Sequence, residues 1–236
     1  MKVFAIPFGG GSANYYKPWQ PMIDKRIELI PLELSGRGNR MFEPLDKSLS
    51  HIVDDVYGQI QDRISDVPYA LFGHSMGALI SFELAQVIRQ KQQPLPRHIF
   101  LSGINSPRTL HPDDKAIHLL DGDDFKKEIL EMGGTGKEIF EHSELVDILV
   151  PVLKNDLRNV YEYQKKTLQY PPLTCNFSVL YGTEDRFPQE QVRGWSSYTT
   201  GACEFYVFTG NHFFINEHTS KVISIINETL IPHLKS

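Results

Sequence analysis

The 236-residue sequence lacks most features that mark secreted, metal-binding, nucleic-acid-binding or membrane proteins. Cys175 and Cys203 are its only cysteines, which are too few for a disulfide framework and lack the paired Cys/His spacing of a zinc site. Its 24 basic residues are outnumbered by 29 acidic ones, and the formal net charge of −5 argues against a nucleic-acid partner. No apolar run reaches the roughly 18 residues that a membrane helix needs, and we find no internal repeat.

The N-terminal apolar run is too short for a signal peptide. It reads M-K-V-F-A-I-P-F and is followed directly by three glycines, whereas a signal peptide needs a longer apolar core and a cleavage site. We therefore expect this run to be a strand. We also expect a cytoplasmic protein, in which the two cysteines remain free thiols rather than forming a disulfide.

Short apolar runs alternate with helical patterns along most of the chain. This alternation predicts an α/β fold with a mostly parallel sheet and helices on both faces. With 41% hydrophobic residues, the whole chain (1–236) is long enough to build one such domain. We expect strands over residues 2–7, 27–34, 69–72, 98–103, 177–181 and 204–208, and helices over residues 15–23, 48–64, 76–89, 189–197 and 217–230.

Residues 111–170 interrupt this alternation. They contain no good strand pattern, but helical patterns cover residues 115–120, 124–132 and 144–166. Pro151 lies inside the third pattern and predicts a kink or a break there. A helical insertion in a βα chain is typical of a lid over one end of the sheet. We therefore predict a lid, and the alternative is a set of additional scaffold helices.

The stretch A-L-F-G-H-S-M-G-A contains a G-x-S-x-G motif centred on Ser75. An expected buried strand before it and a buried helix after it favour a nucleophile elbow over an ordinary βα turn. The glycines would make room for a tight turn that presents the Ser75 hydroxyl at the carboxyl edge of the sheet. The N–H of Met76, at the start of the helix, is then a candidate donor to an oxyanion.

A serine nucleophile needs a base, and the base needs an acid that orients it. The expected chain order is serine, acid, histidine. The sequence G-T-E-D, after the strand at 177–181, offers Glu184 and Asp185, and we favour Asp185 because it lies just past the turn. His212, in G-N-H-F-F after the last strand, is the one histidine of nine with a suitable position. The sequence thus predicts a triad, and a buried structural role is the alternative for His212.

A second oxyanion donor is expected in a loop after an early strand. The run I-P-F-G-G-G at residues 6–11 fits, because small residues let the backbone approach a substrate, and the N–H of Phe8 or Gly9 would complete the pair. The alternative is a flexible turn. The glycine patterns lack the context of dinucleotide or P-loop sites, so we expect no cofactor and no metal.

Taken together, these motifs resemble the type II thioesterases, α/β-hydrolases that accompany nonribosomal peptide and polyketide synthases. The resemblance runs nearly end to end, through P-F-G-G-G-S-A-N-Y-Y-K-P-W, L-S-G-R-G-N-R, F-G-H-S-M-G-A, M-G-G-T, V-P-V-L-K-N-D, G-T-E-D and G-N-H-F-F. It implies the nucleophile Ser75, the acid Asp185, the base His212, and oxyanion amides at Met76 and at Phe8–Gly9. Gly10, Ser35 and Asn211 depart from the usual motifs, and none of these departures removes a catalytic group.

The resemblance implies hydrolysis of acyl or aminoacyl thioesters on the phosphopantetheine arm of an acyl or peptidyl carrier protein, which clears misprimed groups from a synthase. A carboxylesterase or lipase acting on free small esters would have the same triad. A non-catalytic scaffold that binds a carrier would not need all three residues. Carrier proteins are usually acidic, so docking would need local positive charge. Lys17, Arg37 and Arg40 are candidates, unless they are solvated surface.

Overall fold

The centre of the fold is a sheet of six parallel strands. The computed structural model describes residues 1–107, 115–134, 136–166 and 170–234. Every neighbouring pair of strands is parallel, in the order β2-β1-β3-β4-β5-β6, so the predicted α/β sheet is confirmed. The strands are β1 (Lys2–Ile6), β2 (Glu28–Pro31), β3 (Tyr69–His74), β4 (His98–Ser102), β5 (Asn176–Gly182) and β6 (Cys203–Phe208).

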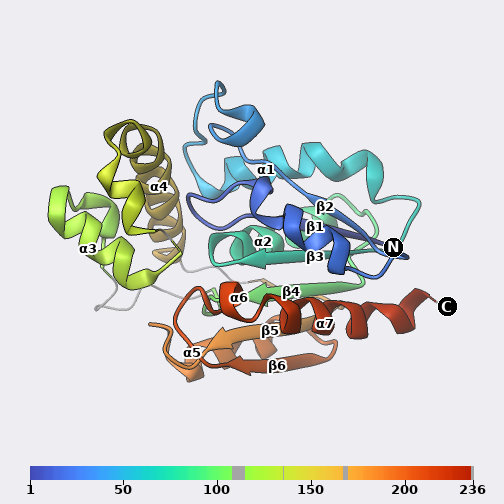
Figure 1. The fold of residues 1–236 in the computed structure, drawn as a ribbon. Coiled ribbons are helices and arrows are strands. Elements are labelled where there is room, and N and C mark those ends of the chain that lie inside the picture. The colour runs from blue at the N-terminus through green and yellow to red at the C-terminus, as the bar shows by residue number, and fades with distance from the viewer. Residues whose placement is uncertain (108–114, 135, 167–169, 235–236) are drawn as a thin grey trace.

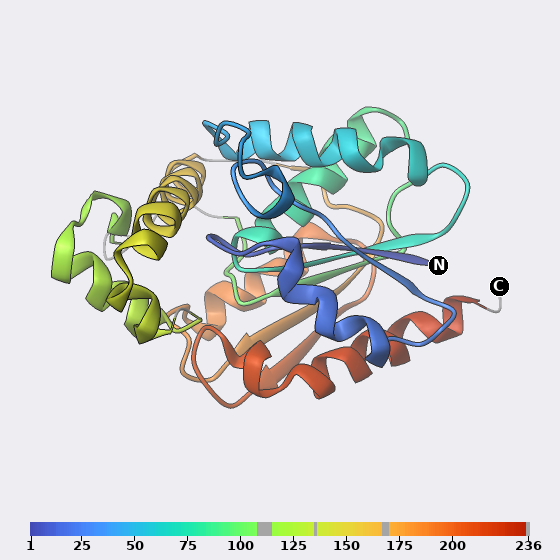
Figure 2. The same cartoon turned by 45° about the horizontal axis from the view of Figure 1, so that its top comes forward.

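Helices cover both faces of this sheet (Figures 1 and 2). One face packs against α1 (Leu49–Ile60), α2 (Met76–Gln90), α5 (Gln189–Arg193) and the 3₁₀ helix η6 (Gly194–Tyr198). The other face packs against η1 (Ala13–Met22), α6 (Phe214–Glu217) and α7 (Thr219–Leu230). Three short 3₁₀ helices, η2 (Gly38–Arg40), η3 (Gln61–Arg63) and η7 (Ile231–Leu234), complete this part of the chain.

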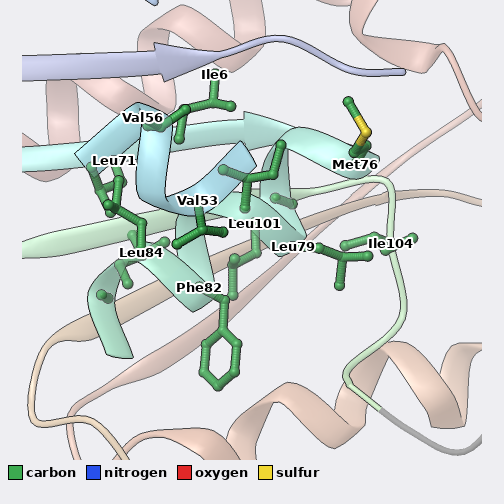
Figure 3. Packing of buried hydrophobic residues seen from close by; sticks show 14 of the residues in the cluster. Ile6, Val53, Val56, Leu71, Met76, Leu79, Phe82, Leu84, Leu101 and Ile104 are labelled. Carbon is green, nitrogen blue, oxygen red and sulfur yellow. The ribbon is translucent and has the colours of Figure 1, made fainter. Parts of the chain in front are cut away.

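Helix α2 is the most deeply buried helix of the first face, as its apolar sequence predicts. Eleven of its 15 residues are buried. Figure 3 shows how its side chains meet those of α1 and of the strands β1, β3 and β4, through Ile6, Val53, Val56, Leu71, Leu79, Phe82, Leu84 and Leu101. Since each fully buried large apolar side chain stabilises the fold by about 1.5–3 kcal/mol, this packing holds the N-terminus of α2 firmly in place.

Several elements differ from the sequence-based expectation. Residues 13–22 form the 3₁₀ helix η1 rather than an α-helix, because Pro18 and Pro21 have no N–H to donate to an i−4 carbonyl. The expected helices over residues 189–197 and 48–64 are α-helical only in α5 and α1 and end as the 3₁₀ helices η6 and η3. The expected last helix is α7, and the separate turn α6 precedes it. None of these differences changes the layer in which the segment lies.

Residues 117–134 and 136–164, which we call the helical segment, lie beyond the carboxyl ends of the strands (Figure 1). They form η4 (Ile117–Leu119), α3 (Gly122–Met132), η5 (Lys137–Glu141) and α4 (Ser143–Gln164), with no strand among their described residues. The predicted start of the insertion at His111 lies outside the described residues.

A kink or a break in α4 was expected at Pro151, and the helix does not break there. The helix continues on both sides of Pro151 for 22 residues in all. A proline inside a helix costs about 3 kcal/mol or more. Burial of Val152 and Leu153 next to it offsets this cost, and Leu153 packs with Ile117, Phe125 and Ile129 in a small apolar cluster within the helical segment.

Candidate active site

Ser75 lies in the turn between β3 and α2, at the carboxyl edge of the sheet. Its backbone has φ 53° and ψ −121°, a conformation that a non-glycine residue adopts rarely and at a cost of order 1–3 kcal/mol. The Ser75 N–H donates to the Ser102 carbonyl of the neighbouring strand end at 2.7 Å. The turn is therefore held in a strained conformation by the sheet, as expected of a nucleophile elbow.

The two glycines of the motif are required by close approach of the backbone. A Cβ on Gly73 would lie 2.0 Å from the Gly77 carbonyl oxygen, and a Cβ on Gly77 would lie 2.3 Å from the Ile6 carbonyl oxygen. Backbone cannot yield as a flexible side chain does, so neither position accepts a larger residue. The second contact also brings the loop after β1 against the N-terminus of α2.

His212 bridges Ser75 and Asp185. Its Nε2 lies 2.9 Å from Ser75 Oγ, and its Nδ1 lies 3.0 and 3.1 Å from the two carboxylate oxygens of Asp185. The side chains of His212 and Asp185 are only 3% and 2% exposed. The structure thus brings together the three residues that the sequence predicts as a triad, in the order nucleophile, base, acid, and shields the His–Asp contact from solvent.

Adjacent Glu184 lies differently from Asp185. The Glu184 side chain is exposed, and its backbone N–H donates to the Gly210 carbonyl at 2.9 Å. A Cβ on Gly182 would lie 2.5 Å from that same carbonyl oxygen, so the glycine lets the loops after β5 and β6 meet. Of the two carboxylates, only Asp185 reaches His212, the contact that the preferred assignment requires.

Asn211, which departs from the family motif, leaves this arrangement intact. Gly210 before it has φ +113°, whereas Asn211 itself is not among the residues with positive φ. Its Oδ1 accepts a hydrogen bond from the Phe213 N–H at 2.9 Å. The glycine thus takes the unusual conformation, and the asparagine closes a small turn that carries His212.

His74, next to the nucleophile, is a buried packing residue. Its Nδ1 lies 2.9 Å from Ser102 Oγ, and its ring lies 5.2 Å from the His212 ring. Burial, and then the nearby His212, lower the pKa of His74 well below its ordinary value of 6.5. A neutral His74 supports the His212 ring without adding charge beside it.

The loop after β1 forms a tight turn beside Ser75. The Gly11 N–H donates to the Phe8 carbonyl at 2.9 Å, and Gly10 has φ +75°, as at the third position of a type II turn. The N–H groups of Phe8 and Gly9 donate no hydrogen bond to any described residue. Met76 is the first residue of α2, so its N–H has no acceptor within the helix. Met76 and the two alternatives for the second donor, Phe8 and Gly9, therefore remain available.

Sequence reasoning missed the residues that hold this turn. The Gly10 N–H donates to Asp156 Oδ2 at 2.7 Å, and Arg37 donates to both oxygens of Asp156. Arg37 was considered for docking on the surface, but it is only 7% exposed, so that hypothesis is wrong for Arg37. Both residues stand in motifs that carry the family resemblance, the one signal that could have singled them out.

Two cavities meet the site between the sheet edge and the helical segment. One, of about 480 Å³, is bordered by Asp185, His212, Phe187 and Met132. The other, of about 230 Å³, is bordered by the Phe8–Gly11 turn and by apolar residues such as Ile129, Leu153 and Phe213. A third cavity of about 600 Å³ lies at the opposite end of the sheet, around Tyr69 and Pro94, far from Ser75.

The described residues contain no candidate metal site and no candidate membrane-spanning helix. No group of three or more of their His, Cys, Asp or Glu side chains is placed to hold a metal ion. Among the helices that they form, none has the length and apolar character needed to cross a membrane.

Comparison with known proteins identifies the family. A model of the thioesterase domain matches residues 1–230. The gramicidin S biosynthesis protein GrsT of Aneurinibacillus migulanus is 33% identical over 231 residues, which cover 98% of this chain and 89% of GrsT. Similar solved structures include ClbQ of the colibactin NRPS/PKS pathway (TM-score 0.89, 32% identity, 98% of this chain and 97% of ClbQ) and the type II thioesterase BorB of the borrelidin cluster (TM-score 0.85, 28% identity, 97% of this chain and 92% of BorB). The chain therefore belongs to the thioesterase family and has its α/β-hydrolase fold, which confirms the resemblance drawn from the sequence motifs.

Proposed function

We propose that this protein hydrolyses acyl or aminoacyl thioesters carried on the phosphopantetheine arm of a carrier protein, with Ser75 as nucleophile. The observation that carries the proposal is the chain of contacts from Ser75 Oγ through His212 to Asp185, with all three distances between 2.9 and 3.1 Å. A hydroxyl in such an arrangement has a base within reach of its proton, and the base has a fixed orientation.

The reaction has two halves that use the same groups. In the first, His212 Nε2 takes the proton of Ser75 as Oγ attacks the thioester carbonyl carbon. The C–S bond then breaks, and the thiol leaves with the proton from His212. In the second, His212 takes a proton from water, which attacks the acyl-Ser75 ester. The C–Oγ bond breaks, Ser75 regains its proton, and the carboxylic acid is released.

Asp185 keeps the imidazole in the productive tautomer. With the proton of neutral His212 on Nδ1, that N–H donates to the carboxylate, and Nε2 is left as the acceptor for the Ser75 hydroxyl. When His212 becomes a cation in each half-reaction, the buried negative charge of Asp185 stabilises it.

The oxyanion of each tetrahedral intermediate is stabilised by backbone N–H groups. Met76 supplies one donor from the start of α2, and the Phe8–Gly9 stretch supplies the other. Because the Gly10 N–H already binds Asp156, it is not one of the donors. Removing a single donor of this kind from an enzyme costs about 10²–10³ in kcat, so this pair contributes a large share of the rate.

Relatives and the helical segment support the proposed substrate. ClbQ belongs to an NRPS/PKS pathway, and BorB is a type II thioesterase of a biosynthetic cluster. In this chain the helical segment acts as a lid over the two cavities, between which an acyl group and a phosphopantetheine arm can be accommodated. The protein would work in the cytoplasm, where its two cysteines stay reduced.

Labelling with a fluorophosphonate tests the site directly. The wild-type protein should lose activity and gain one adduct, which peptide mass spectrometry should locate at Ser75. The Ser75→Ala variant should neither label nor hydrolyse an acyl thioester, although its fold should persist because the elbow glycines remain. A variant with activity within about tenfold of wild type would mean another nucleophile, since losses of many thousandfold are usual when a triad serine is removed. A wild-type protein that does not label would support the scaffold alternative.

A further inference from the structure

A buried carboxylate links the helical segment to the turn beside the nucleophile. Asp156 lies on α4 and is 0% exposed. One of its oxygens accepts a hydrogen bond from the Gly10 N–H at 2.7 Å, across 146 positions of sequence. The Cβ of Asp156 also lies 3.4 Å from where a Cβ on Gly9 would be. The helix therefore packs directly on the Phe8–Gly11 turn.

Arg37 completes this link from the other side of the turn. Its Nη1 and Nη2 donate to the two oxygens of Asp156 at 2.5 and 2.9 Å, and Nη1 also lies 3.5 Å from the Gly11 carbonyl oxygen. Both members of this ion pair are buried, with side chains 7% and 0% exposed. The pair thus binds the Gly10 N–H through Asp156 and the Gly11 carbonyl through Arg37.

The bonding of Gly10 limits how the turn can face the substrate. With Gly10 N–H directed at Asp156, the neighbouring N–H groups of Phe8 and Gly9 remain without partners among the described residues. Burying two charges is costly unless they are paired and hydrogen-bonded. Apolar side chains could attach α4 to the turn without that cost, so the buried ion pair of Asp156 and Arg37 indicates a specific role at the turn. An interaction that fixes one amide of a four-residue turn also fixes the direction of the others.

We propose that Asp156 and Arg37 are positioning residues for the oxyanion site: they hold the Phe8–Gly11 turn so that its free N–H groups face the reacting carbonyl, and they do so only while α4 is docked. The proposal rests on the proposed function, because it assigns a role to residues outside the triad in that same reaction. Its consequence is that the helical segment affects stabilisation of the transition state as well as access to the cavity.

Two other contacts provide matched controls. Glu83, on α2, accepts hydrogen bonds from Tyr163 at 2.5 Å and Tyr170 at 2.7 Å, so it attaches the end of α4 without touching the turn. Arg40 pairs with both oxygens of Asp55 at 2.6 and 2.8 Å, in the same loop region as Arg37. Glu83→Gln therefore tests attachment of the helix, and Asp55→Asn tests loss of a two-pronged ion pair.

The test compares these controls with Asp156→Ala, Asp156→Asn and Arg37→Gln. For each variant, kcat and KM are measured with acetyl coenzyme A. The inhibition constant is measured with methyl trifluoromethyl ketone, the analogue of an acetyl group. Such a ketone forms a tetrahedral oxyanion adduct with the serine and so reports on the oxyanion site. Thermal midpoints report stability separately.

For Asp156→Ala we expect kcat to fall by about 10²-fold or more, the effect of losing an oxyanion donor, with KM changed less than about threefold. The inhibition constant should rise by a similar factor. Asp156→Asn retains an acceptor for Gly10 and should lie between wild type and alanine, while both controls should keep kcat within about threefold.

Three results would overturn the inference. One is a kcat within about threefold of wild type in Asp156→Ala. The second is a lower kcat with unchanged inhibition by the ketone. The third is a loss of kcat no greater than that of Glu83→Gln at an equal change in thermal midpoint. If Asp156→Ala does not fold, the asparagine and Arg37→Gln variants decide by the same criteria. Failure of the proposed function would look different from failure of this inference. If Ser75 is not the nucleophile, the Ser75→Ala variant should still hydrolyse the thioester and bind the ketone as the wild type does.

Discussion

Replacing Asp185 by asparagine removes the negative charge that faces His212 and keeps the shape of the side chain. In the native site the carboxylate lies 3.0 Å from His212 Nδ1 and is 2% exposed, so solvent screens it little. An amide at this position has no charge to stabilise the imidazolium. If its NH₂ group faces Nδ1, it also favours the tautomer in which Nε2 carries the proton and cannot accept one from Ser75.

The size of the effect follows from two independent arguments. Two unit charges about 4 Å apart interact by about 4 kcal/mol at an effective dielectric constant of 20, which corresponds to roughly 10³ in rate at about 1.4 kcal/mol per tenfold. The same substitution in a well-studied serine protease triad lowers kcat about 10⁴-fold, because the wrong tautomer adds to the loss of charge. We therefore expect a loss of about 10³ to 10⁴ in kcat for Asp185→Asn.

The assay is the release of coenzyme A from an acetyl thioester, followed with a thiol reagent, and Glu184→Gln is the control. It removes an adjacent carboxylate whose side chain is exposed, so it should cost far less than Asp185→Asn. A thermal midpoint near that of wild type would show that each variant is folded. The reasoning is refuted if Asp185→Asn keeps activity within about tenfold of wild type, or if Glu184→Gln is the crippled variant.

Two further predictions concern stability and dynamics. Burial lowers the pKa of His98 to about 4 from 6.5, so the unfolded chain binds more protons between these values. Stability should therefore fall as pH drops below 6.5, by about 2 kcal/mol between pH 7 and pH 5 from this group. Denaturant titrations at both pH values should show that His98→Gln loses less on acidification than wild type, and an equal loss in both would contradict the assignment. In hydrogen exchange, α3 should exchange faster than α2, because only Phe125 and Ile129 of α3 are buried; equal protection would indicate a rigid scaffold rather than a lid.

Much of the fold and the triad was predictable because the relevant signals are local. The motif around Ser75 has a buried strand, a glycine turn and an apolar helix in immediate succession, and each of these is visible in the sequence. Parallel strands then place the loops that follow them at one edge. The positions of Asp185 and His212 after their strands were therefore enough to bring them near Ser75.

The rest was not predictable because it depends on contacts between distant segments. A charged residue on a helix is usually solvated, and nothing local to Asp156 or Arg37 shows that they are buried together. Their contact with Gly10 spans 146 positions of sequence and forms only once α4 packs on the loop after β1. The continuation of α4 through Pro151 has the same origin, since tertiary packing outweighs a local preference there.

The most direct test of the proposed function is a comparison of one acetyl group in three contexts. It is presented on a phosphopantetheinylated carrier protein, on coenzyme A and on a simple oxygen ester, and kcat/KM is measured for each, with the carrier followed by intact-mass spectrometry. We expect the carrier to be the best substrate, because binding energy from its surface and arm holds the thioester in place before Ser75 attacks. Coenzyme A supplies the arm without the surface of the carrier protein, and the oxygen ester reaches only the cavities beside the triad. If the oxygen ester has the highest kcat/KM of the three, the protein is an esterase and the carrier-based function is wrong.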